Sequence, residues 1–143
     1  MKSPVHPAVI YWDASAILSA LIQDKYSEDA QYWAAQDGVH LLSSLSYSEV
    51  LAVLSRIRRE KRLTVGLIRS AVDTLENGPW RSMHIVPEWA LIKKLSNRWP
   101  LRGADLWHLA TAKTFQSQIP ETILLTYDTK LKVAAQGEKM ALL

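Results

Sequence analysis

The chain has 143 residues, of which 48% are hydrophobic and 22% charged, and its formal net charge is +3. This length suits one domain with one core, and the composition excludes a disordered or low-complexity protein. The charge is too small to indicate a nucleic-acid partner by itself. We therefore expect residues 1–143 to form a single globular domain.

Cysteine is absent, which excludes a disulfide framework, a thiolate zinc site and a cysteine nucleophile. The sequence shows no signal-peptide pattern and no apolar run of the roughly 18–20 residues that a membrane span requires. The four histidines show no zinc-binding spacing. We expect a cytoplasmic protein that has no contact with the membrane.

The first predicted strand is the short apolar run at residues 8–12, which stops at Asp13. A helix-compatible pattern follows from Ala14. The next helix begins at Ser27 and stops at Gly38, and residues 39–42 form the second strand.

The following helix has a start signal, because Ser46 and Glu49 have the S-x-x-E spacing of a capping box. This helix ends in a basic run at residues 56–62. Thr64 can cap another helix, which Asn77-Gly78-Pro79 closes.

Residues 83–86 are predicted to form the third strand. Pro87 and Glu88 suit the first turn of a helix, and Pro100 prevents this helix from continuing. Apolar periodicity sustains a further helix from Asp105 to about residue 115. The fourth strand covers residues 122–126.

A last helix follows at residues 129–135. Strands and helices therefore alternate along the whole chain. This order predicts an α/β three-layer sandwich with a central, mainly parallel sheet of four to five strands.

Four acidic residues share one property, since each stands where a predicted helix begins: Asp13, Glu49, Asp105 and Asp128. Two of them, Asp13 and Asp128, also follow a strand directly, at the sheet edge where α/β proteins bind ligands. If the four converge, raised pKa values or a bound cation must relieve their repulsion. Carboxylate oxygens favour Mg²⁺ or Mn²⁺. Taken singly, each residue also fits a structural role as a helix cap or in a helix first turn.

Four segments around these acids resemble the PIN-domain family, and among its branches the VapC-type toxins most closely. They are VIYWDASAIL, LSYSEVLAVLSR, GADLWHLATA and LLTYDTKLKVAA, and they occur in the family's order. The resemblance covers essentially the whole chain. The family often has a further acidic residue near the third or fourth, and this chain has no clear counterpart.

The resemblance implies a ribonuclease that hydrolyses RNA with a metal-activated water. The cofactor would be Mg²⁺, with Mn²⁺ as a substitute, held chiefly by Asp13 and Asp105. Glu49 and Asp128 would complete the metal shell or position the nucleophile. Ser15 and Thr126 are candidate hydrogen-bond donors behind these ligands. The resemblance also implies a homodimer and a small antitoxin whose C-terminal segment blocks the acidic cleft.

Several basic residues are candidates for binding RNA: Arg56, Arg59, Arg62 and Arg102. The first three could follow an RNA backbone or merely complement the dipole of a solvated helix end. Arg102 lies in the loop just before Asp105 and is better placed to contact the substrate phosphate.

His108 follows Asp105 by three residues and so lies on the same helical face, which invites a proton-transfer role. A buried structural histidine is the interpretation we favour. Trp80 and Trp99 stand beside prolines and could stack on bases, but burial is the more usual use of an indole.

Two other functions fit parts of this pattern. A phosphoacceptor receiver domain would need adjacent acids after the first strand and a lysine after the last, whereas Asp13 has no acidic neighbour and Lys130 is misplaced. A degenerate PIN domain would bind RNA or protein without cutting. The presence of all four carboxylates argues against that alternative.

Overall fold

The computed structural model describes residues 8–141. Its sheet has four strands in the order β3-β2-β1-β4, and every pairing is parallel. The strands are β1 (Ala8–Trp12), β2 (Gly38–Ser43), β3 (Trp80–Met83) and β4 (Thr122–Leu125). Because all strands run the same way, their carboxyl ends share one edge of the sheet. The helices that follow the strands begin at that edge.

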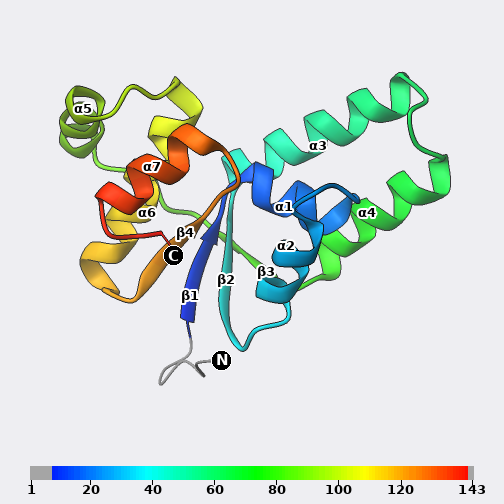
Figure 1. Ribbon diagram of the computed structural model, residues 1–143, viewed down its shortest axis with the longest axis horizontal. Helices are drawn as coiled ribbons and strands as arrows, with labels where there is room; N and C mark the ends of the chain where they lie inside the picture. The colour runs from blue at the N-terminus through cyan, green and yellow to red at the C-terminus, as the bar shows by residue number, and fades with distance from the viewer. Residues whose placement is uncertain (1–7, 142–143) are drawn as a thin grey trace.

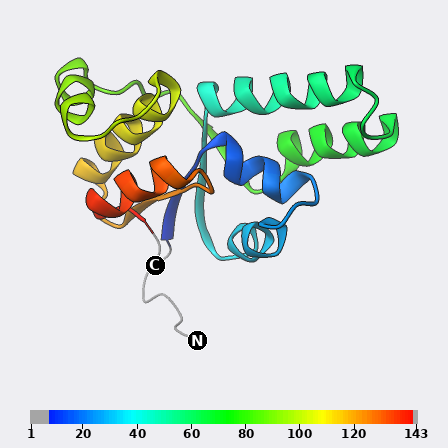
Figure 2. The same ribbon diagram turned by 45° about the horizontal axis from the view of Figure 1, so that its top comes forward.

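Seven helices surround the sheet within the described residues. They are α1 (Ala14–Leu21), α2 (Ser27–Ala34), α3 (Ser44–Arg59), α4 (Val65–Asn77), α5 (Trp89–Arg98), α6 (Gly103–Gln118) and α7 (Thr129–Gly137). Helices α1 to α4 lie on one side of the sheet and α5 to α7 on the other (Figure 1; Figure 2). None of them is both long and apolar enough to cross a membrane.

The sheet separates two apolar cores because successive side chains of a strand point to opposite faces. On β1, Ile10 and Trp12 belong to the core shared with α1, α3 and α4, whereas Val9 and Tyr11 belong to the core shared with α5, α6 and α7. Trp12 and Tyr11 are fully buried. These two cores confirm the predicted three-layer α/β sandwich with a mainly parallel sheet of four to five strands; the sheet has four strands within the described residues, all of them parallel.

Three predicted helix starts are confirmed by side-chain caps. Asp13 accepts a hydrogen bond from the backbone N–H of Ala16, Thr64 from that of Leu67, and Asp128 from that of Leu131. Each bond satisfies a donor that the first turn of a helix leaves without an intrahelical partner. Two of the caps place an acidic residue directly at the carboxyl edge of the sheet.

The predicted capping box was wrong. Helix α3 begins at Ser44, two residues before Ser46, and its cap is Ser43, which accepts from the Ser46 N–H. The Ser46 hydroxyl instead donates to the backbone oxygen of Trp12 over 2.9 Å. Ser46 therefore joins α3 to β1, and Glu49 is free to make a different contact.

The third strand lies earlier than predicted, at Trp80–Met83 rather than residues 83–86. The reason is Trp80, whose ring packs edge-on against Trp12 with centroids 5.4 Å apart. This contact buries Trp80 in the core, so it is not available to stack on a base. Val86, which the prediction placed in the strand, is 75% exposed.

A buried carboxylate holds the end of α7 against α5 and α6. Glu138 accepts hydrogen bonds from the Trp99 indole over 2.8 Å and from Arg98 over 2.5 Å, and it lies 3.4 Å from the Lys113 ammonium. Burial would raise the pKa of Glu138, but the bonds from Trp99 and Arg98 outweigh it and lower the pKa below its usual range. The Trp99 indole thus has a structural partner within the fold.

Candidate active site

The four predicted carboxylates come from four separate chain segments that meet near the carboxyl edge of the sheet. Asp13 caps α1 and Asp128 caps α7, while Asp105 lies in the first turn of α6. Glu49 lies in the second turn of α3. The topology accounts for this arrangement, because α1, α3 and α7 follow directly from β1, β2 and β4.

Asp13 is the most deeply buried of the four, with 3% of its surface exposed. One carboxylate oxygen accepts from the Ser15 hydroxyl over 2.7 Å and from the Ala16 N–H over 2.9 Å. The other accepts from the Thr126 hydroxyl over 2.5 Å. Burial raises the pKa of Asp13, and these three hydrogen bonds partly offset that effect. Ser15 and Thr126 thus lie against Asp13, as their predicted role requires.

Asp105 and Asp128 line an open cavity of about 330 Å³. Arg102 and Lys130 line the same cavity, so two cations stand beside two carboxylates. Burial raises the pKa of Asp105, and the negative charges of Asp128 and Glu49 raise it further, while His108 and Arg102 oppose them. Asp105 is therefore close enough to Asp128 and Glu49 for their negative charges to act on it.

Lys130 was not among the predicted binding residues. Lys130 lies in the first turn of α7, two residues after Asp128, and this position in the sequence could have indicated a binding role. Arg102 lies in the predicted place, directly before α6 and beside Asp105.

Glu49 contacts a histidine rather than another carboxylate. Its Oε1 lies 2.6 Å from Nε2 of His108, and the Nδ1 of the same ring lies 2.6 Å from the Tyr11 hydroxyl. His108 is buried, as expected for a structural histidine, with 1% of its surface exposed. Its contact with Glu49 gives it a place in the site that the sequence did not reveal.

The basic run 56–62 lies apart from the carboxylates. Arg56 and Arg59 are exposed on the last turns of α3, and Arg62 follows the helix and pairs with Glu60 over 3.4 Å. They lie toward the tip of the α3–α4 hairpin, which extends away from the sheet (Figure 1). Because α3 has 16 residues, it is about 24 Å long, and Glu49 lies nearer its other end.

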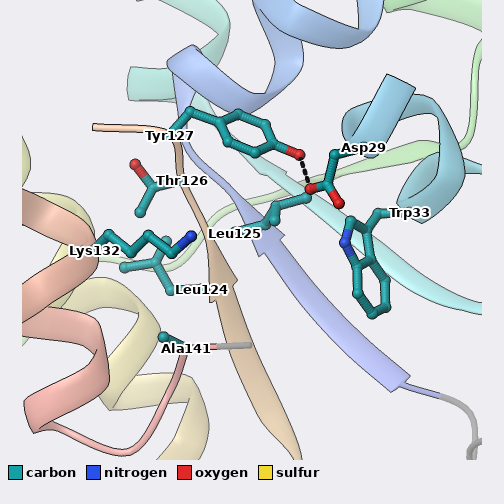
Figure 3. A pocket seen from close by; sticks show the side chains of 8 residues that line it. All are labelled: Asp29, Trp33, Leu124, Leu125, Thr126, Tyr127, Lys132 and Ala141. Atoms are coloured by element: carbon teal, nitrogen blue, oxygen red, sulfur yellow. Dashed lines mark hydrogen bonds between the residues drawn. The ribbon is translucent and has the colours of Figure 1, made fainter. Parts of the chain in front are cut away.

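A second, smaller cavity of about 120 Å³ follows strand β4 and contains none of the four acids. Figure 3 shows Tyr127 crossing its upper side, where the hydroxyl donates to Asp29 of α2 over 2.5 Å. The Tyr127 N–H donates to the Ser15 hydroxyl over 3.0 Å. These bonds hold the segment that carries Asp128 against α1 and α2. The sequence gives no signal for the Tyr127–Asp29 contact, which joins positions 98 residues apart.

The residues at this edge fit a hard divalent cation by their chemistry. Among residues 8–141, no group of three or more His, Asp or Glu side chains is arranged to hold a metal ion. Mg²⁺ does not require such a group, because it keeps several waters and is commonly bound by one or two carboxylates together with substrate phosphates. Asp105 and Asp128 offer two such carboxylates at an open cavity, where burial and the negative charge of Asp128 raise the pKa of Asp105.

Comparison with known proteins identifies the family. The model of the PIN domain matches residues 10–137, and the chain belongs to the PIN-domain family. The predicted resemblance is thereby confirmed, and the receiver-domain alternative is excluded.

Curated relatives point to the VapC branch. Ribonuclease VapC35 of Mycobacterium tuberculosis is 30% identical over 139 residues, which cover 93% of this chain and 94% of that protein. Ribonuclease VapC49 of the same species is 30% identical over 134 residues, 90% of each chain.

Two solved structures share the fold. VapC20 of Mycobacterium tuberculosis, described as a sarcin-ricin loop cleaving toxin, aligns with a TM-score of 0.59 and 16% identity over 87% of this chain and 94% of its own. PAE2754 of Pyrobaculum aerophilum aligns with a TM-score of 0.61 and 16% identity over 91% of this chain and 81% of its own. At this identity the likeness supports the fold alone.

Proposed function

We propose that this chain is a single-domain, metal-dependent endoribonuclease whose active site consists of Asp13, Glu49, Asp105 and Asp128. The observation that carries the proposal is the cavity at the carboxyl edge of the sheet, where Asp105 and Asp128 stand beside Arg102 and Lys130. Membership of the PIN-domain family and the similarity to proteins named ribonuclease VapC support RNA as the substrate.

Mg²⁺ or Mn²⁺, when bound, would supply a nucleophilic water at neutral pH and stabilise negative charge on the phosphate. Asp13 and Asp105 would be the chief ligands of the cation, and Asp128 and Glu49 would complete its shell or position the nucleophilic water. Arg102 and Lys130 would bind phosphate oxygens of the RNA backbone. Ser15 and Thr126 would keep the Asp13 carboxylate in one orientation through their hydroxyl donors.

The relatives belong to the VapC branch of the family. This similarity supports the proposal that the chain is the toxin of a toxin–antitoxin pair and acts in the cytoplasm. Its partners would be a small antitoxin, whose C-terminal segment covers the acidic cleft, and a second copy of the chain. Exposed apolar side chains could be buried in such contacts; examples are Trp89, which is 89% exposed, and Val65, which is 62% exposed. Light scattering of the isolated chain should give a dimer mass, and a monomer at micromolar concentration would contradict the homodimer.

Cleavage of structured RNA tests the enzymatic proposal. The purified protein should cut RNA in Mg²⁺ or Mn²⁺ and stop when the metal is chelated. Asp105→Asn should lower the rate on the order of a thousandfold or more, because it removes a ligand of the cation that provides the nucleophile. Asp13→Asn should have a similar effect, and the double variant should be hardly worse than either single one.

Asp37 provides a matched control, because it is an exposed aspartate in the turn before β2, at the opposite edge of the sheet. Asp37→Asn should cleave at the wild-type rate. Activity that survives EDTA would refute the metal requirement. Folded wild type that binds RNA without cutting it in either metal would favour the degenerate PIN alternative.

A further inference from the structure

We propose that His108 is a positioning residue that fixes the Glu49 carboxylate at the edge of the site, and that Tyr11 sets the direction in which His108 donates its proton. This inference rests on the proposed function, in which Glu49 belongs to the active site. It assigns a role to two residues of the core that do not themselves line the cavity.

The contacts form one continuous chain from the interior to the site. The Ser43 hydroxyl lies 2.9 Å from the Tyr11 hydroxyl, which lies 2.6 Å from Nδ1 of His108. Nε2 of His108 lies 2.6 Å from Oε1 of Glu49. The first three residues are all buried, whereas 34% of the Glu49 side chain is exposed. Glu49 is thus the end of a buried chain that reaches the surface.

For a neutral His108 ring and an ionised Glu49, proton counting gives the direction of every bond in this chain. A carboxylate only accepts hydrogen bonds, so Nε2 of His108 must carry the proton that it shares with Glu49. In the neutral ring, Nδ1 then has a free lone pair and must accept from the Tyr11 hydroxyl. Tyr11 has only that one proton, so the Ser43 hydroxyl donates to the Tyr11 oxygen over 2.9 Å rather than to the Ser46 hydroxyl, which is farther away at 3.3 Å. The Ser43 oxygen can do this while it accepts from the Ser46 N–H at 3.1 Å.

Without the Tyr11 hydroxyl, Nδ1 of the buried ring would have no hydrogen-bond donor, and the tautomer with its proton on Nε2 would lose part of its advantage. Tyr11 is therefore more than a packing residue, because its hydroxyl stabilises the tautomer that Glu49 requires. Burial of both rings on α6 and β1 prevents either from turning away. One Glu49 oxygen, Oε1, is held in this way, and the negative charge of Glu49 acts on Asp105, which lines the cavity. Residues that orient a ligand in this manner typically affect metal affinity 10–100-fold.

The same fold contains a natural control. His40 is also a buried histidine with both ring nitrogens engaged, since Nδ1 lies 3.1 Å from the Trp12 indole nitrogen and Nε2 lies 2.9 Å from the Gln36 backbone oxygen. It faces the other core and contacts none of the four candidate acids. A substitution there tests the cost of losing a buried histidine without touching Glu49.

The variants are His108→Leu, which removes the donor, and His108→Gln, whose side-chain amide can replace Nε2–H. Mn²⁺ binding to the folded proteins is measured by calorimetry, and RNA cleavage is resolved into kcat and KM. We expect His108→Leu to weaken Mn²⁺ binding 10–100-fold and to lower kcat with little change in KM. His108→Gln should restore most of the Mn²⁺ affinity and most of kcat. His40→Leu should lower the melting temperature and leave the Mn²⁺ affinity unchanged. Wild-type Mn²⁺ affinity in His108→Leu, or a Gln variant no better than Leu, would overturn the proposal.

Two measurements keep the test decisive if His108→Leu does not fold. Tyr11→Phe retains the ring and removes only the hydroxyl, and it should weaken Mn²⁺ binding severalfold; an unchanged affinity would count against the role of Tyr11. The ¹⁵N shifts of the His108 ring in the metal-free wild type should report a proton on Nε2, and a ring protonated on Nδ1 alone would overturn the chain of donors. The shifts require neither metal nor activity. A wild type that shows the Nε2–H ring but binds no Mn²⁺ and cuts no RNA would refute the proposed function and leave the hydrogen-bonded chain intact.

Discussion

Thr126, directly after β4, donates a hydrogen bond from its hydroxyl to the carboxylate of Asp13 over 2.5 Å, although the two positions are 113 apart in the sequence. The parallel pairing of β1 with β4 brings the two together, with Trp12 opposite Leu125 one residue earlier. The Thr126 oxygen also accepts from the Asp128 N–H over 3.1 Å. One threonine thus connects two of the candidate acids.

Thr126→Val tests this connection through stability. Valine keeps the shape of the side chain but leaves one oxygen of a buried carboxylate without its donor, which should lower the free energy of unfolding by about 1–3 kcal/mol. Urea unfolding monitored by tryptophan fluorescence measures the change. Thr74→Val is the control, because Thr74 is exposed on α4 and bonds only within its own helix, to Ser70; its effect should stay within about 0.5 kcal/mol. Equal losses in the two variants would contradict the role of Thr126.

The raised pKa of Asp13 gives a dependence of stability on pH. Because burial makes the folded state hold this proton more tightly than the unfolded state, the ionised carboxylate destabilises the fold above the raised pKa. This cost disappears as the pH falls through that pKa toward the ordinary aspartate value. In EDTA, Asp13→Asn should therefore be more stable than wild type at pH 7.5, and the difference should narrow on acidification.

Unfolding free energies of Asp13→Asn and wild type across a pH series provide the measurement, with Asp37→Asn as the exposed counterpart. A variant that is less stable than wild type at pH 7.5 would show that the three hydrogen bonds outweigh the cost of burial. Saturating Mn²⁺ should reverse the order, because the cation stabilises only the protein that can bind it.

The contribution of Glu138 to stability should depend on pH in the opposite direction from that of Asp13. Its pKa is lowered in the fold by Trp99 and Arg98, so its contribution is fully present above the ordinary value of 4.5 and is lost as the pH falls through the lowered one. Glu138→Gln should cost about 2 kcal/mol at pH 7, since charge-assisted bonds are replaced by weaker ones. The difference in stability between variant and wild type should narrow as the pH falls from 4.5 through the lowered pKa of Glu138. Glu121→Gln, at an exposed position before β4, is the matched control substitution.

Local signals in the sequence were enough to predict several parts of the site. Asp13 and Asp128 cap helices immediately after strands, and both the strand and the cap are encoded within a few residues. The contact between His108 and Glu49 could not be predicted, because it joins positions 59 residues apart on two helices that lie on opposite sides of the sheet. The same holds for the third strand, where the packing of Trp80 against Trp12 overrides the apolar pattern of residues 83–86.

The capping-box prediction failed for a related reason. Ser46 and Glu49 have the right spacing, but Ser46 is fully buried and its hydroxyl reaches the backbone of β1. A tertiary contact therefore took the place of the local one. Glu49 takes no part in capping the helix, and its carboxylate contacts His108 instead.

The basic run at the tip of the α3–α4 hairpin raises the last question, whether it binds RNA or only complements the end of a helix. Arg59 and Arg62 are exposed and lie apart from the carboxylates, so their removal should leave the chemistry intact. If they contact the backbone of a substrate held at the carboxyl edge, Arg59→Gln with Arg62→Gln should weaken RNA binding and reduce its dependence on salt. For single-stranded RNA, each lost phosphate contact should lower the slope of log K against log salt by about 0.7.

Fluorescence anisotropy with the cleavage-deficient Asp105→Asn background gives the affinity at several salt concentrations, and the active background gives kcat. We expect the double hairpin variant to show a shallower slope, a higher KM and an unchanged kcat. Arg102→Gln, by contrast, should lower kcat, because Arg102 lines the cavity with Asp105. Lys93→Gln on α5 removes an exposed charge at a distance from the hairpin and controls for the loss of net charge. Should the hairpin variant keep the wild-type slope and affinity, the run serves only to complement the dipole of α3, and RNA recognition belongs to Arg102 and Lys130.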